Sequence, residues 1–245
     1  MQIIIDIETI PSQAAGAKTQ ARASIKPPGT LKKPESIAAW WATEAETAIE
    51  DAYRKQSLDG GLQGEIISIA LAGADEETGW VQCRAQGESE AALLNAFVDA
   101  VTKRLDAYCE QLLSTFPSYT DPAEIRLHKP EPYFIAHNAA FDLPYIWHRC
   151  IITGVRLPFA FPTPAARAGK DYGCTMASWA GFAGRVSLDA LCRALKLPSP
   201  KDGGIDGAGV YDAWLAGEYE RIAAYNLRDT LATREVWHRL NGGAA

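Results

Sequence analysis

The chain begins with an apolar run that carries two acidic residues. Residues 2–8 read Gln-Ile-Ile-Ile-Asp-Ile-Glu, which places Asp6 and Glu8 among isoleucines. Such a run is typical of a central strand buried on both faces of a sheet. Side chains two residues apart on a strand leave the same face, so Asp6 and Glu8 point the same way. Two buried carboxylates repel each other unless cations neutralise them, and Mg²⁺ or Mn²⁺ suits an all-oxygen site.

A bare Asp-x-Glu motif also has a simpler interpretation, in which the strand ends and both carboxylates face water. An acidic residue near the C-terminus is harder to explain in this way. Tyr225 and Asp229 are four residues apart, on a helical face that also carries Ile222 and Val236. An Asp on an inward stripe is costly unless it is paired or ligates a metal. Arg228 is the nearest candidate partner, but it points to another side of the helix.

A third acidic position follows a strand predicted over residues 132–136. His137 and Asn138 end this strand, and Asp142 lies one turn into the next predicted helix, which runs to about residue 152. Carboxylates therefore come from a central strand, from the helix after a later strand and from the last helix. Each motif alone is weak evidence, but the three in this order indicate one acidic site.

The remaining pattern predicts an α/β fold with a mixed sheet. Further strands are expected at 66–71 and 80–83, and further helices at 89–116, 187–196, 209–216 and 218–240.

The segment between the first two strands, residues 11–64, does not fit this plan. From Gly16 to Pro34 it has five basic residues, three prolines and no acidic residue, which predicts a long loop or arm. Residues 36–56 predict a helix within the same insertion. One hypothesis is that the basic segment 16–34 tracks the phosphate backbone of a substrate. A tolerated disordered loop is an equally good interpretation.

Composition narrows the class of protein. The 245 residues are 47% hydrophobic and 22% charged, as in a soluble globular protein, and we expect one domain over 1–245. A net charge of −6 argues against a broad basic nucleic-acid surface, but not against an enzyme that meets phosphates through bound cations. The chain shows no membrane-spanning run and no signal peptide, so no membrane partner and a cytoplasmic location are expected. The five cysteines form no CxxC pair and predict free thiols.

The three acidic motifs resemble those of the DnaQ-like 3′–5′ exonucleases of the ribonuclease H-like superfamily. That family has an Asp-x-Glu strand, an Asn…Asp strand–helix junction and a final Tyr-x-x-x-Asp helix. Tyr225 points to the tyrosine (DEDDy) branch, and within it to stand-alone relatives of the family B DNA polymerase proofreading domain. The resemblance covers residues 1–11 and about 65–237. The shared features are Asp6 to Pro11, His137-Asn138 before Phe141-Asp142, and Lys201 to Gly207 before the helix of Tyr225.

The resemblance implies a ribonuclease H-like fold and hydrolysis with two Mg²⁺ or Mn²⁺ ions as cofactors. Asp6, Glu8 and Asp229 would bind the ion that activates water. Asp6 and Asp142 would hold the second ion, which steadies the leaving 3′ oxygen. Tyr225 would orient the attacking water, because a tyrosine with a pKa near 10 is a poor base.

Four further residues are expected at the substrate. Asn138 would hydrogen-bond the terminal nucleotide and Phe141 would stack on it, although a core role suits Phe141 equally well. His137 is more easily explained as a hydrogen-bonded structural residue than as a metal ligand. Thr9 belongs to the first motif and is expected beside the substrate.

The expected function is a 3′–5′ exonuclease acting on the 3′ end of single-stranded nucleic acid. DNA is favoured, with an RNA-directed exoribonuclease as the alternative, and a separate DNA polymerase or repair protein is a candidate partner. A haloacid dehalogenase-type phosphatase is less favoured, because that family needs an Asp where Glu8 stands. A non-catalytic nucleic-acid-binding module is also less favoured, because degenerate relatives usually lose acids and this chain retains all four. The sequence leaves the oligomeric state open.

Overall fold

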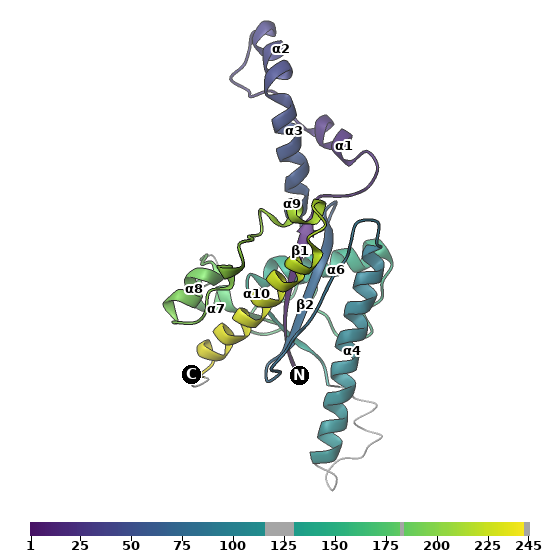
Figure 1. The fold of residues 1–245 in the computed structure, drawn as a ribbon, viewed down its shortest axis with the longest axis vertical. Helices are drawn as coiled ribbons and strands as arrows, with labels where there is room; N and C mark the ends of the chain where they lie inside the picture. Colours follow the sequence, from purple (N-terminus) through teal and green to yellow (C-terminus); the bar gives the residue numbers. More distant parts are fainter. Residues whose placement is uncertain (116–129, 182–183, 243–245) are drawn as a thin grey trace.

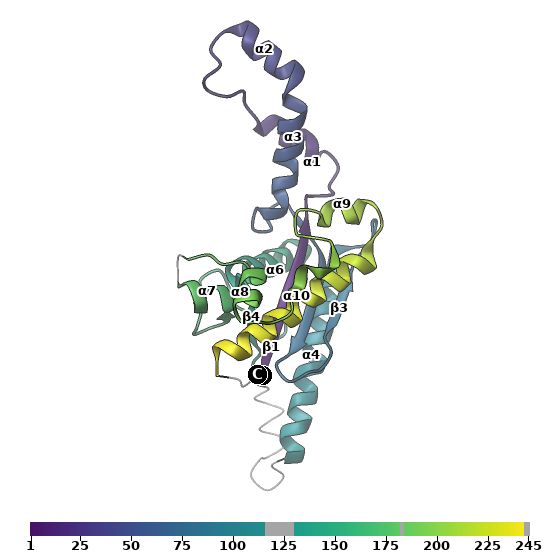
Figure 2. The ribbon, with the colours of Figure 1, turned by 60° about the vertical axis from the view of Figure 1, so that its left-hand side comes forward.

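The computed structural model describes residues 1–115, 130–181 and 184–242. Within these residues five strands form one mixed sheet in the order β3-β2-β1-β4-β5 (Figures 1 and 2). β1 pairs antiparallel with β2 and parallel with β4. The predicted α/β class with a mixed sheet is confirmed, and the strand order fits a ribonuclease H-like exonuclease fold. The strands are β1 (Gln2–Ile10), β2 (Glu65–Gly73), β3 (Trp80–Cys83), β4 (Tyr133–Ala136) and β5 (Gly173–Cys174).

Helices lie on both faces of this sheet and in the insertion after β1. The insertion holds α1 (Ala17–Ser24), α2 (Pro34–Thr43), α3 (Ala45–Arg54) and the 3₁₀ turn η1 (Lys55–Leu58). The body holds α4 (Glu90–Thr115), α6 (Ala139–Thr153), α7 (Thr175–Ala180), α8 (Leu188–Ala194), η2 (Pro200–Gly203), α9 (Val210–Leu215) and α10 (Tyr219–Leu240). Residue 116, the predicted end of the long helix, lies outside the described residues.

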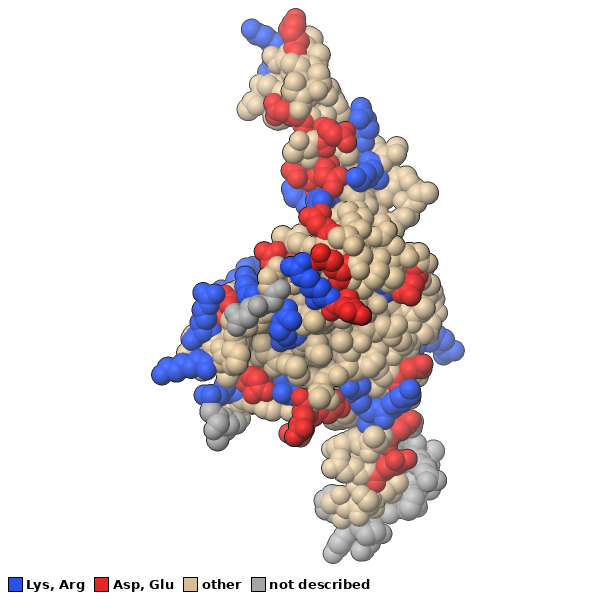
Figure 3. Space-filling model, viewed as in Figure 1, with Lys and Arg blue, Asp and Glu red and all other residues tan. Residues whose placement is uncertain are grey.

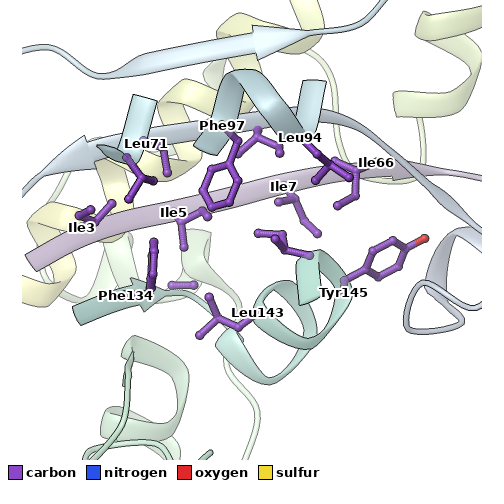
Figure 4. Close-up of a cluster of buried hydrophobic side chains, with 14 of the residues drawn as sticks. Ile3, Ile5, Ile7, Ile66, Leu71, Leu94, Phe97, Phe134, Leu143 and Tyr145 are labelled. Atoms are coloured by element: carbon purple, nitrogen blue, oxygen red, sulfur yellow. The ribbon is translucent and has the colours of Figure 1, made fainter. Parts of the chain in front are cut away.

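β1 is buried on both faces, as its apolar run predicts. Ile3, Ile5 and Ile7 join the large core under α4 and α6, together with Phe97 and Leu143 (Figure 4). Ile4 and Ile10 face the other way, where they pack against Trp237 and Ile222 of α10. Figures 1 and 2 show α10 crossing one face of the sheet, with α4 on the other. The strand therefore alternates between two cores, and any polar side chain in it is held between packed layers.

β1 extends past the end of β4, which opens the position where the acids lie. The parallel pairing runs only from Gln2 opposite Tyr133 to Ile4 opposite Ile135. Beyond β4 the chain turns into α6 through Asn138, whose left-handed backbone (φ 61°, ψ 41°) is a conformation that Asn tolerates better than most residues. On the edge that faces β4, the second half of β1 is thus flanked by the start of α6 instead of by a strand.

The insertion occupies residues 11–64 as predicted, but its basic segment is not simply a loop. Residues 17–24 form α1, because Ala17 and Ala21 pack on Tyr53 of α3. The predicted helix over 36–56 is two helices, α2 and α3, joined at Glu44. The two-alanine stripe of α1 is too short to reveal a helix in sequence, and its packing partner lies far along the chain.

The insertion projects from the body and is seated at its base. Thr9 at the end of β1 donates a hydrogen bond to the Ser57 carbonyl oxygen (2.8 Å). Arg54 pairs with Asp212 of α9 at 2.7 Å, and Tyr53 meets Tyr211 of the same helix edge to face. These contacts fix the direction in which the insertion leaves the sheet.

Charges of both signs are spread over this insertion (Figure 3). Lys18 pairs with Glu50 of α3 at 2.8 Å, and Arg22 lies over the Trp41 ring. Lys26, Lys32 and Lys33 are exposed.

β5 is a two-residue strand that no periodicity could predict. Gly173 sits against Trp237 of α10, and a Cβ there would lie 2.9 Å from the indole ring. Glycine is therefore required for α10 to pack this closely on the sheet edge. All five cysteines are free, as predicted. No helix among the described residues is long and apolar enough to cross a membrane.

Candidate active site

Three acids from the first strand and the last helix meet on the α10 side of the sheet. Asp6 and Glu8 come from β1 and Asp229 from α10. One carboxylate oxygen of each lies within 4.8 Å of the others. Glu8 is only 8% exposed. The sheet and α10 thus hold three negative charges close together in a largely buried place.

Asp142 is the fourth acid and reaches β1 from α6. Its side chain is 4% exposed and accepts hydrogen bonds from its own backbone N–H and from that of Ile7. The Ile7 N–H lies beyond the stretch of β1 that pairs with β4. The charge of Asp142 acts on both Asp6 and Glu8. The overshoot of β1 past β4 therefore lets an acid from α6 join the acids of the strand.

Burial perturbs all four acids, and repulsion by the other acids adds to its effect at Asp6 and Glu8. Burial raises the pKa of Asp6 well above its usual range, and the charges of the other acids raise it further. The pKa of Glu8 rises for the same reasons. Burial also raises the pKa of Asp142 to about 8 and that of Asp229 to about 6. Each acid is thus held in a site that disfavours its charged form.

No Lys, Arg or His side chain of the described residues makes an ion pair with any of these four acids. Arg228, the alternative partner of Asp229, donates instead to the Pro200 carbonyl oxygen at 3.4 Å. The charges of Arg228 and Lys201 lower the pKa of Asp229, but by less than burial raises it. Four buried or half-buried carboxylates without a paired protein cation suit a hard divalent ion such as Mg²⁺ or Mn²⁺. The residues present therefore fit the metal that the motifs predict.

Tyr225 lies beside Asp229 on α10, one turn earlier. Its side chain is 7% exposed, and its hydroxyl hydrogen-bonds the Asp229 carboxylate. Burial raises the tyrosine pKa, and the charges of Glu8 and Asp229 raise it further. The hydroxyl therefore stays protonated and can act as a hydrogen-bond donor, not as a base.

The structure adds Asn226, which the motifs alone do not single out. Its side chain is fully buried, and its Nδ2 donates to Asp6 Oδ2 at 2.6 Å. Its Oδ1 accepts from the Ser68 hydroxyl of β2 at 2.9 Å. The sequence indicates this buried position only weakly, because Asn226 lies four residues after Ile222 and is therefore on the inward face. A buried amide there must have polar partners.

Two predicted substrate residues already have partners within the protein. His137 Nε2 lies 3.0 Å from the Val186 carbonyl oxygen and Nδ1 lies 2.8 Å from the Thr175 hydroxyl. Burial lowers the pKa of His137, so the neutral ring donates from Nε2 and accepts at Nδ1. The hydroxyl of Thr9 donates to the insertion. These bonds favour a structural role for His137 and link Thr9 to the base of the insertion.

Asn138 and Phe141 lie at the start of α6, next to Asp142. Both side chains are half-buried. Phe141 packs against the large core and lies 5.3 Å from the Tyr145 ring, measured between centroids. One part of Phe141 therefore belongs to the core while another part is accessible, which is compatible with both predicted roles.

Comparison with known proteins gives a match to the second half of the chain. Residues 124–243, just under half of the sequence, match the family described as a predicted 3′–5′ exonuclease related to the exonuclease domain of PolB. The predicted resemblance is confirmed. Among curated proteins, none matches the chain.

The matched segment and the fold support exonuclease activity from different directions. The match includes Asp142, Tyr225 and Asp229, but it begins long after Asp6 and Glu8. The fold brings Asp6 and Glu8 next to the matched segment, because β1 pairs with β4 and packs against α10. The family match supports a 3′–5′ exonuclease, that is, a hydrolase of phosphodiester bonds, and exonuclease domains of this type typically use divalent metals.

Proposed function

We propose that the protein removes nucleotides one at a time from the free 3′ end of single-stranded nucleic acid, with DNA favoured over RNA. The observation that carries the proposal is the cluster of four buried or half-buried acids, with no protein cation paired to them among the described residues. The preference for DNA rests on the resemblance to proofreading domains, and an exoribonuclease is the alternative. A polymerase or repair protein is a proposed partner.

The four acids would hold two Mg²⁺ or Mn²⁺ ions. Asp6, Glu8 and Asp229 would ligate one ion, and Asp6 and Asp142 the other. Two bound ions of this kind supply an activated water and stabilise the leaving 3′ oxygen. The chain itself would position the ligands. α6 and α10 fix the positions of Asp142 and Asp229, and the packed cores under these two helices keep them rigid.

Tyr225 would position the attacking water. Its protonated hydroxyl already donates to Asp229, so a water near this carboxylate meets a donor and an acceptor side by side. Phe141 and Asn138 would contact the terminal nucleotide from the start of α6. Lys201 and Arg228, whose charges are felt at Asp229, would attract the phosphate that approaches the acids.

A labelled-strand assay tests this function. DNA and RNA oligonucleotides with a 5′ label, single- or double-stranded, would be digested with Mn²⁺ or with EDTA. We expect a descending ladder from the free 3′ end, no reaction in EDTA and none with Asp6→Asn. Cutting of circular single-stranded DNA, or cleavage of p-nitrophenyl phosphate without cleavage of oligonucleotides, would contradict the proposal.

The exposed lysines of the insertion are proposed to contact the substrate backbone at a distance from the acids. Replacing Lys32 and Lys33 by Gln should flatten the slope of log affinity against log salt by roughly 0.7 per lost contact with a single strand. The matched control replaces two exposed lysines of the body, Lys103 and Lys170. Equal slopes in the two variants would show that the insertion has no such role.

A further inference from the structure

Asn226 connects Asp6 to the interior of the protein. Its fully buried amide lies between the Asp6 carboxylate of β1 and the Ser68 hydroxyl of β2, at 2.6 and 2.9 Å. Ser68 is also the cross-strand neighbour of Glu8. A short chain of hydrogen bonds therefore begins beside one acid of the site and ends on another.

This chain of hydrogen bonds has only one possible direction when Asp6 is ionised, the form in which it ligates a metal. An ionised carboxylate can accept hydrogen bonds but cannot donate them, so the nitrogen of the amide must face Asp6. The amide oxygen then faces Ser68, whose hydroxyl must donate. A reversed Asn226 would place two acceptor oxygens 2.6 Å apart. The ionised Asp6 thus selects the orientation of Asn226, Ser68 secures that orientation, and the fixed amide in turn holds the Asp6 carboxylate.

The carboxylate of Asp6 needs such a constraint. The terminal torsion of an Asp side chain has a broad energy profile, so packing alone holds the carboxylate plane poorly. The residue opposite Asp6 on β2 is Ala70, which offers no polar group. One donated hydrogen bond fixes the plane while it uses a single lone pair of Oδ2, and the other lone pairs stay available for ligation.

We propose that Asn226 is a positioning residue of the metal site, which orients the Asp6 carboxylate before an ion binds, with Ser68 holding Asn226 in turn. This inference rests on the proposed function. Hydrogen-bonding partners of metal ligands typically contribute about 10- to 100-fold to metal affinity, and we expect Asn226 to fall in this range.

Calorimetric titration of the metal-free protein with Mn²⁺ tests the inference without any nuclease assay. Asn226→Leu keeps the branched shape of the side chain and removes the donor, so we expect Mn²⁺ to bind at least about tenfold more weakly. Ser68→Ala should cause a smaller loss, because the carboxylate itself still selects the orientation of the amide. The double variant should bind no more weakly than Asn226→Leu, since Ser68 acts only through Asn226.

A control on the same helix separates positioning from stability. Thr230→Val removes a buried hydrogen bond to the Asn226 carbonyl oxygen (2.9 Å) without touching Asp6. We expect this variant to lower the melting temperature and to leave Mn²⁺ affinity unchanged. If Asn226→Leu does not fold, Asn226→Ser carries the same expectation. Unchanged affinity in a folded Asn226 variant would overturn the inference alone. A wild-type protein that binds no Mn²⁺ would refute the proposed function as well.

Discussion

Among the described residues, two groups of buried or half-buried carboxylates stand out, and the protein neutralises only one of them. At the start of β2 and α4, Glu90 pairs with Arg149 of α6 at 2.5 Å and accepts the Ile66 backbone N–H at 2.7 Å. Glu65 pairs with the buried Arg84 nearby. The four acids of the site have no such guanidinium within the described residues.

The difference is the one expected between acids that serve the fold and acids that bind a cation. A buried carboxylate that serves the fold is given a charged partner, because an unpaired charge in the interior is strongly destabilising. Around Asp6 the fold places further acids where a cation would be expected. Under the proposed function a bound divalent ion supplies the positive charge, and changes to the two groups should have opposite effects on stability and activity.

The largest expected effect is on activity, in the unpaired group. Asp6→Asn keeps the shape of the side chain but removes the charge shared by both proposed ions, so the rate should fall by at least about 10³-fold. The metal-free protein should melt at a higher temperature, because one of four repelling charges is lost. Single-turnover rates and melting curves in EDTA check both parts. An active variant would refute the assignment of Asp6.

The paired group should give the opposite result. Glu90→Gln leaves the Arg149 guanidinium buried without a counter-charge, which should cost about 3–5 kcal/mol of unfolding free energy. The rate per folded molecule should stay near that of the wild type. Urea unfolding and an assay normalised to folded protein measure these quantities. If Glu90→Gln stabilised the protein, the distinction between the two groups would fail.

A smaller effect is expected for Tyr225→Phe, which sharpens the role of the acids. The ring keeps its packing, and only the hydroxyl that would position water is lost. The rate should fall by about 10- to 1000-fold, while Mn²⁺ affinity should hardly change. A joint loss of metal binding and activity would make Tyr225 a structural residue of the site.

The smallest effect concerns the dependence of stability on pH. The pKa of Asp229 (about 6) and that of Asp142 (about 8) lie above the ordinary value, so the folded protein binds protons that the unfolded chain releases. The stability of the metal-free protein should therefore fall as the pH rises from about 4, the ordinary pKa of an Asp carboxyl, to about 8. Mn²⁺ prefers the ionised acids and should counter the loss. The difference between the melting temperatures with and without Mn²⁺ should widen as the pH rises. A difference that does not change with pH would contradict the raised pKa values of these acids.

The sequence predicted much of the fold because its strands and long helices follow a regular period. The run of isoleucines in β1 and the inward stripe of α10 could be read directly. α1 and β5 could not, since α1 depends on contact with Tyr53 and β5 depends on a single glycine under Trp237. The order of the three motifs indicated one acidic site, and the resemblance gave roles to its four acids, but spacing within one motif does not place distant elements together.

Asn226 illustrates the remaining limit. Its position on the inward face could be read from the helical period, but its partners could not. The amide is needed only because Ser68 lies on the strand next to that of Asp6, two residues away from the position directly opposite Asp6, and this register depends on the pairing of β1 with β2. A residue that acts by orienting a second side chain can therefore be identified from the structure but not from the sequence alone.

The contact between β1 and α10 has a consequence for synthesis of the protein. Asp6 and Asn226 are separated by 220 positions along the chain. The ribosome releases β1 well before α10, so the acids of the strand have no partners from this helix while the residues between the two elements are made. Contacts between such distant segments form slowly. An unfinished chain thus lacks the acidic cluster, and a nuclease built in this way acquires its site only when the final helix closes onto the first strand.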